Sequence, residues 1–167
     1  SPEYKTKLTL CFAVVARSSL ESILERCTEA VLAVFQPVLA SRVQFDIFND
    51  WDRRAGRLGQ IVTAAAKQCG CGALPVVRKP EKLDDLLLAE GASVFASADG
   101  LAPDEAARGL AGKTDLKLFV GPEGGFTKGE LEFAARSGAV FMNLGLYTLR
   151  AETACLAAVS ALLTRLG

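Results

Sequence analysis

Apolar residues follow two alternating patterns along this chain, short continuous runs and longer segments with helical spacing. Residues 8–16 form an apolar run that favours a strand. From Leu20 to Val31, apolar positions then recur three and four residues apart, which predicts one buried helix face. The same alternation predicts further strands at 34–38, 74–77, 93–97, 117–120 and 139–143, and helices at 51–68, from Pro80, at 103–110, after Thr127, and at 152–166. Strands separated by helices predict an α/β fold with a parallel sheet.

The length and composition indicate one domain over residues 1–167 whose core needs no disulfide or metal to be stable. A chain of 167 residues, half of them apolar, can bury roughly two thirds of its unfolded surface. The last predicted helix, 152–166, is apolar on nearly every side, so we expect it to be mostly buried. Packing within the domain and a helix shared with a second subunit both explain it.

The cysteines indicate no metal site. The chain has five of them, scattered through apolar segments, and we interpret them as reduced thiols of a cytoplasmic protein. Cys69 and Cys71 are close in sequence, but the chain has no histidine and no second close cysteine pair, so we expect no structural metal. No apolar run reaches the roughly 18 residues of a membrane span, and we expect no membrane partner.

Two loops carry the candidate chemistry. The first follows the strand at 117–120 and contains Gly121, Pro122, Glu123, Gly124 and Gly125. Its glycines let main chain approach a ligand closely. The helix after this loop should begin at a capping box, since Thr127 is followed three residues later by Glu130.

The second loop, 144–149, leaves the strand at 139–143 and leads to Arg150 and Glu152 at the start of the last helix. Ligands of parallel α/β sheets bind beyond the carboxyl ends of strands. Because both loops follow strands, we expect a ligand between them.

The spacing of these glycines excludes two common nucleotide motifs. A phosphate-binding P-loop needs lysine after its last glycine, whereas Glu130 follows Gly129 here. No Gly-x-Gly-x-x-Gly fingerprint of a dinucleotide site fits these residues. A small nucleotide-binding module of the flavodoxin type is therefore disfavoured.

The two loops together closely resemble a known signature. GPEGGFTKGE at 121–130, followed by LG at 144–145 and LRAETA at 149–154, resembles the C-terminal signature of the 16S ribosomal RNA (uracil-N3)-methyltransferases, the ribosomal small subunit methyltransferase E family of the SPOUT superfamily. Segments 25–42 and 64–77 are also similar to that family. The resemblance implies a parallel-sheet SPOUT methyltransferase fold with a C-terminal trefoil knot, and S-adenosyl-L-methionine as the cofactor.

The resemblance also assigns roles to residues. It implies that the cofactor is held by backbone groups of Gly121, Pro122, Glu123, Gly124, Gly125, Leu144, Gly145 and Leu149. The reaction would transfer a methyl group to N3 of a uridine in 16S ribosomal RNA, free or in the small ribosomal subunit. We expect Arg150 to stabilise the uracil anion and to contact RNA. The proton acceptor stays open between Glu123, Glu152 and solvent.

Arg42 and Gln68 match family positions that meet RNA, and the resemblance implies a homodimer. The formal net charge is zero, which is unexpected for an RNA-binding protein. We therefore expect an N-terminal PUA-like RNA-binding barrel, present in the family and absent from this chain, to supply most RNA affinity. Two basic clusters remain, and a solvated face or RNA contact explains them equally well: Arg53, Arg54 and Arg57, then Arg78, Lys79 and Lys82.

Departures from the family pattern leave an alternative function open. The family usually has an acidic residue before the glutamine and an arginine three positions after it, where this chain has Lys67 and Cys71. The alternative is a catalytically drifted or retargeted knotted RNA-binding homologue.

Overall fold

The computed structural model describes residues 4–13, 17–42, 49, 51–122, 124–145 and 149–167. They form a seven-stranded sheet in which each neighbouring pair is parallel, in the order β3-β2-β1-β6-β5-β7, with β4 paired to β2. The strands are β1 Lys7–Phe12, β2 Val34–Leu39, β3 Val76–Val77, β4 Glu81–Lys82, β5 Ala92–Leu101, β6 Asp115–Val120 and β7 Val140–Met142. The predicted α/β class with a parallel sheet is confirmed.

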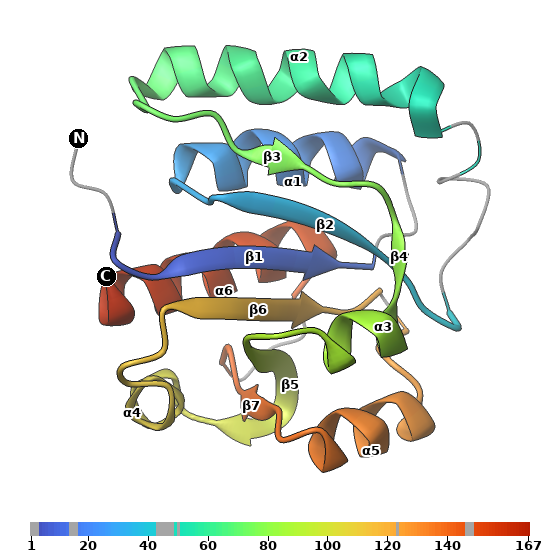
Figure 1. The fold of residues 1–167 in the computed structure, drawn as a ribbon, viewed down its shortest axis with the longest axis vertical. Helices are drawn as coiled ribbons and strands as arrows, with labels where there is room; N and C mark the ends of the chain where they lie inside the picture. The colour runs from blue at the N-terminus through green and yellow to red at the C-terminus, as the bar shows by residue number, and fades with distance from the viewer. Residues whose placement is uncertain (1–3, 14–16, 43–48, 50, 123, 146–148) are drawn as a thin grey trace.

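Six helices accompany the sheet in the described part of the chain (Figure 1). They are α1 Arg17–Glu29, α2 Trp51–Cys69, α3 Leu83–Leu88, α4 Pro103–Gly109, α5 Lys128–Arg136 and α6 Ala151–Leu166. Helix α6 packs against β1, β6, α1 and α4, and α2 packs against α1. The last helix of the chain therefore covers the two central strands on one face of the sheet.

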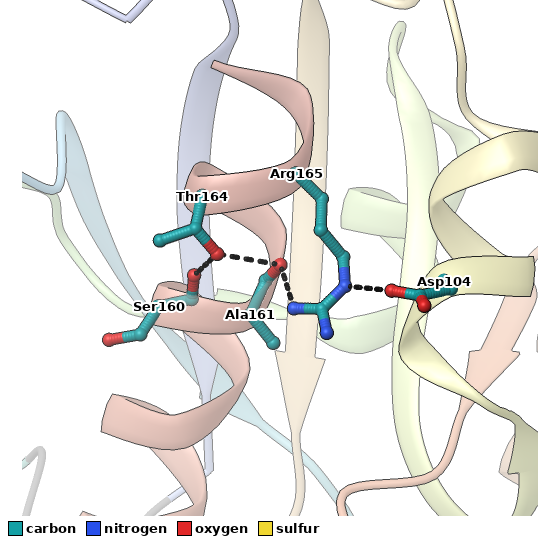
Figure 2. A network of polar contacts seen from close by, with 5 residues as sticks. All are labelled: Asp104, Ser160, Ala161, Thr164 and Arg165. Atoms are coloured by element: carbon teal, nitrogen blue, oxygen red, sulfur yellow. Dashed lines mark hydrogen bonds and ion pairs between the residues drawn. The ribbon is translucent and has the colours of Figure 1, made fainter.

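Two polar anchors fix helices to their neighbours. On β6, the buried Lys117 donates from Nζ to the carbonyl oxygens of Leu86 and Ala89, which ties the end of α3 to the sheet. Burial lowers the pKa of Lys117. Near the C-terminus, Arg165 Nε of α6 donates to Asp104 Oδ1 of α4 at 2.6 Å (Figure 2). Both contacts join segments distant in sequence.

Aromatic rings form the core beneath the carboxyl ends of the central strands. The rings of Phe95 on β5 and Phe119 on β6 stack with centroids 4.5 Å apart. Phe126 and Phe141 contact Phe95, at 5.3 and 5.6 Å. Because Phe126 lies in the glycine loop, this cluster anchors that loop to the sheet.

Most predicted elements are present with shifted ends, and one was placed wrongly. The short helix was predicted from Pro80 but begins at Leu83, because Glu81 and Lys82 pair with Val38 and Leu39 as strand β4. The first strand ends at Phe12 rather than at residue 16, and residues 14–16 lie outside the described part. The last helix buries Cys155, Val159 and Leu162 as expected.

The prediction that all five cysteines are reduced thiols is wrong for two of them. Cys69 and Cys71 form a disulfide, because Gly70 at φ +69° turns the chain after α2 and leaves their Cα atoms 5.5 Å apart. The other three, Cys11, Cys27 and Cys155, are free and buried, and burial raises the pKa of each thiol. Among the described residues, no cluster of three potential metal ligands occurs, and no helix is long and apolar enough to cross a membrane.

Candidate functional site

A cavity of about 340 Å³ lies at the carboxyl ends of β5, β6 and β7 and reaches the start of α6. Both loops singled out in the sequence contribute to it. Among the described residues that line it, none carries a charge: Ala96, Ser97, Ala98, Val120, Gly121, Pro122, Gly125, Phe126, Leu131, Asn143, Leu144, Gly145, Leu149, Ala151 and Ala154. Its recognition groups are therefore main-chain amides and carbonyls, with the polar tips of Ser97 and Asn143.

The first loop is held by its own backbone and by the helix that follows. Gly125 has φ +72° and donates its N–H to the carbonyl of Pro122 at 2.7 Å. Thr127 and Glu130 form the predicted capping box, with Thr127 N to Glu130 Oε1 at 2.8 Å and Glu130 N to Thr127 Oγ1 at 3.2 Å. The loop thus ends at a fixed helix start, which holds its main chain in place.

Close packing also explains Gly121. A Cβ there would lie 3.1 Å from the ring of Phe126. Phe126 is itself fixed against Phe95. Gly121 therefore lets the loop fold over its own aromatic anchor.

Asn143 organises the second loop. Its main-chain N–H donates to the Leu101 carbonyl at 2.7 Å, and its side-chain amide donates to the Ala98 carbonyl at 2.8 Å. Its side-chain oxygen accepts from Gly145 N at 2.8 Å. One side chain thus joins β5 to the start of the loop, and Gly145 then turns the chain at φ +132°.

The structure brings together most of the predicted cofactor residues. Those that line the cavity are Gly121, Pro122, Gly125, Leu144, Gly145 and Leu149. Gly124 is exposed and is not part of the lining, but its carbonyl accepts a hydrogen bond from Arg42 Nη1. Glu123 lies outside the described residues. A cofactor-binding role for these residues stays a prediction.

The predicted RNA and catalytic residues lie in three places. Arg150 is exposed at the N-cap of α6, between the cavity residues Leu149 and Ala151, and its side chain makes no cap hydrogen bond. Arg42 follows β2 and contacts the glycine loop, while Ser41 N bonds Glu130 Oε2 at 3.2 Å. Gln68 is exposed near the end of α2, on the side where the strands begin (Figure 1). Within this chain, Gln68 is therefore remote from the cavity.

Sequence reasoning missed part of the lining. Ala96, Ser97 and Ala98 of β5 form one wall, and Asn143 links that wall to the second loop. The available signal was a run of small residues at the end of the predicted strand 93–97. Its relevance depends on β5 lying between β6 and β7, which the order of elements along the chain does not reveal.

Comparison with known proteins gives the family. The model of the RNA methyltransferase domain family matches residues 2–163. The chain belongs to this RNA methyltransferase family. It is 29% identical over 147 residues to the ribosomal RNA small subunit methyltransferase E of Aquifex aeolicus, which covers 87% of this chain and 62% of the relative. The corresponding protein of Synechocystis sp. is 31% identical over 170 residues, or 96% of this chain and 55% of the relative. The resemblance found in the sequence is confirmed.

Solved structures agree. The Neisseria gonorrhoeae small subunit methyltransferase E bound to S-adenosyl methionine has a TM-score of 0.84 and 25% identity, covering 98% of this chain and 68% of that one. A Legionella pneumophila protein in complex with the same cofactor has a TM-score of 0.85 and 26% identity, covering 97% and 67%. The chain spans between 55% and 68% of the length of four of the curated relatives that it matches.

Proposed function

We propose that this chain is the S-adenosylmethionine-dependent domain of an enzyme that methylates N3 of a uridine in 16S ribosomal RNA. The observation that carries the proposal is the uncharged cavity built jointly by both glycine-bearing loops. The chain belongs to an RNA methyltransferase family, and two of its structural relatives bind this cofactor. The cavity is a suitable place for the same cofactor in this chain.

The residues present fit that cofactor. The cavity volume of about 340 Å³ lies in the range of small-molecule sites. Its apolar walls suit a neutral purine, and Gly121, Gly125 and Gly145 line it without side chains that would keep a ligand from the main chain. When bound, the cofactor supplies an activated methyl group, and the protein chiefly orients the acceptor and excludes water.

Arg150 is the residue best placed to assist the acceptor. Uracil must lose its N3 proton, and the anion that develops is stabilised by a nearby cation. In the chain, Arg150 stands between Leu149 and Ala151, two residues of the cavity wall. Three candidates could accept the N3 proton. They are Glu152, which is half buried in the first turn of α6, Glu123 of the first loop, and solvent.

The proposal includes the finer features implied by the family resemblance. These are a trefoil knot formed by the C-terminal segment, a homodimer, a cytoplasmic location, and an N-terminal PUA-like barrel in the complete protein. The half-buried Leu156, Ala157 and Ala161 support the dimer, since they leave apolar surface on α6 for a partner. Relatives longer than the matched region leave room for a barrel.

The proposal is tested by mass spectrometry of 16S ribosomal RNA from cells that lack the complete protein. We expect one methyluridine to be absent, and to return when the gene is restored. Calorimetry of the protein with S-adenosylmethionine, against FMN and NAD as controls, tests cofactor choice separately. Unchanged RNA methylation together with no cofactor binding would refute the function.

A second candidate is a retargeted RNA-binding homologue. It is favoured by Cys71, which stands where the family usually has arginine and is held in a disulfide with Cys69. This candidate predicts cofactor binding without loss of the ribosomal methyluridine in the deletion strain.

A further inference from the structure

The turn that follows β2 is tied by two hydrogen bonds to the glycine loop, residues 121–126, and to the helix after that loop. Arg42 Nη1 donates to the Gly124 carbonyl. Ser41 N donates to Glu130 Oε2 at 3.2 Å, and the other oxygen of that carboxylate accepts from Thr127 N at 2.8 Å. Neither Ser41 nor Arg42 lines the cavity. The turn after β2 therefore holds the loop and the first turn of α5 from outside the cavity.

The peptide unit between Gly124 and Gly125 is held on both sides. Arg42 binds its carbonyl oxygen, and its N–H, which belongs to Gly125, donates to the Pro122 carbonyl at 2.7 Å. Glycine adopts many backbone conformations at little cost, so the two glycines themselves impose little on the orientation of this peptide unit. The hydrogen bonds to Arg42 and Pro122 therefore decide which way it faces.

This peptide unit borders the cavity. Pro122 and Gly125 line the cavity, while Gly124 is exposed. The ring of Phe126 anchors the end of the loop in the aromatic core, and Arg42 supplies a contact in the middle of the loop. A rotation of the peptide unit would move the main chain of Gly125, and the wall of the cavity would change with it.

We propose that Arg42 is a positioning residue for the cofactor, because it holds the glycine loop in the conformation that forms the cavity. The inference rests on the proposed function and goes beyond the family resemblance, which implies an RNA contact for this residue. A hydrogen bond from a guanidinium to a carbonyl is charge-assisted and thus stronger than one between neutral groups. Without it, the loop would sample other conformations, and fewer molecules would be ready to bind the cofactor.

The test is calorimetry of S-adenosylmethionine binding to the complete protein in the absence of RNA. Arg42→Gln should bind about tenfold more weakly, which is the ratio expected if about one molecule in ten keeps the competent loop. Arg42→Lys keeps one charged donor and should lose less affinity. The matched control is Arg165→Gln, which also removes an arginine hydrogen bond, to Asp104, at the end of α6 far from the cavity. It should bind like the wild type.

Amide hydrogen exchange, followed by nuclear magnetic resonance in the protein without ligand, tests the loop directly. The Gly125 N–H should exchange about tenfold faster in Arg42→Gln than in the wild type, whereas the N–H of Leu118 in the core strand β6 should be unchanged. A general loss of stability would speed both amides. This measurement needs no cofactor, so it still decides the role of Arg42 if the wild type binds no S-adenosylmethionine, a result that would refute the proposed function.

The proposal is overturned if Arg42→Gln binds the cofactor as tightly as Arg165→Gln, or if its Gly125 exchange matches that of the wild type. Filter binding of 16S ribosomal RNA separates the other role of this residue. An Arg42→Gln variant that loses RNA affinity alone would make Arg42 an RNA contact without a part in the cofactor site, and this too would overturn the inference.

Discussion

Gly145 holds the second loop in a backbone conformation that residues with a side chain rarely adopt, at φ +132°. It also lines the cavity and donates its N–H to Asn143. Gly138 is a useful comparison, because it has φ +86° after α5 and does not line the cavity. In both places an added Cβ meets open space, so backbone strain is the main effect of a substitution.

Gly145→Ala and Gly138→Ala should therefore separate stability from binding. Each should lower the free energy of unfolding by about 1 to 2 kcal/mol, because alanine at positive φ is strained. Only Gly145→Ala should also weaken S-adenosylmethionine binding, measured by calorimetry. Equal affinity of the two variants would remove Gly145 from the cofactor site.

Arg150 tests the chemistry. Arg150→Ala in the complete protein should lower kcat for RNA methylation by about 10²- to 10³-fold, the usual cost of losing one group that stabilises a developing anion. Cofactor affinity should stay unchanged, since the cavity lining does not include its side chain. Single-turnover methylation measures the rate, and Arg150→Lys, which keeps the charge, should retain part of it. An undiminished rate in Arg150→Ala would exclude the role.

At the scale of elements, the contact between α4 and α6 gives a pH dependence. The hydrogen bond and charge of Arg165 hold the pKa of Asp104 below its usual value (Figure 2). The folded state therefore binds this proton less readily than the unfolded chain. Its stabilisation is complete above the ordinary aspartate pKa of about 4, and it is lost as pH falls through the lowered value.

Asp104→Asn should thus lower stability slightly at neutral pH and leave it unchanged in strong acid. The effect is small because the pair is exposed to solvent. Urea unfolding at both pH values measures it. Asp99→Asn, at an exposed aspartate of β5, controls for the loss of one carboxylate. A difference that persists in strong acid would contradict the assignment to Asp104.

The turn after α2 gives a redox prediction. Under non-reducing conditions, folded protein should take up no iodoacetamide, because Cys69 and Cys71 are bonded and Cys11, Cys27 and Cys155 are buried. A mild reductant should expose two thiols, and denaturation in reductant all five. Mass spectrometry counts the adducts. The double variant Cys69→Ser/Cys71→Ser should take up no adducts after mild reduction. Adducts at Cys69 and Cys71 of the wild type before reduction would contradict the disulfide.

Local sequence signals predicted most helices and strands. Features that depend on contacts between segments distant in sequence could not be predicted. The capping box at Thr127 was readable because both partners lie within one turn. Strand β4 was missed because two residues become a strand only by pairing with β2. The Ala96–Ala98 wall depends on β5 lying between β6 and β7. The disulfide was missed because reduced cysteines were predicted from the expected cell compartment. The turn at Gly70, which brings Cys69 and Cys71 together, was not considered.

For the whole molecule, α6 leads to a prediction about assembly. Its buried side faces β1 and β6, while Leu156 lies half exposed beside Ser22, Glu25 and Glu29 of α1. A leucine in this position gains by burial against a second copy, which is the dimer that the proposed function includes. The same face would then join the two copies through their C-terminal helices.

Leu156→Glu should therefore convert the dimer to a monomer, because a carboxylate buried without a partner is costly. Sedimentation equilibrium measures the mass of each species. Leu88→Glu is the matched control, since Leu88 is 73% exposed on α3, away from α6, and its variant should stay dimeric. A wild type that sediments as a monomer would exclude the dimer. A dimeric Leu156→Glu would move the interface to another face, where the loops around Arg150 would no longer lie beside the helix that joins the copies.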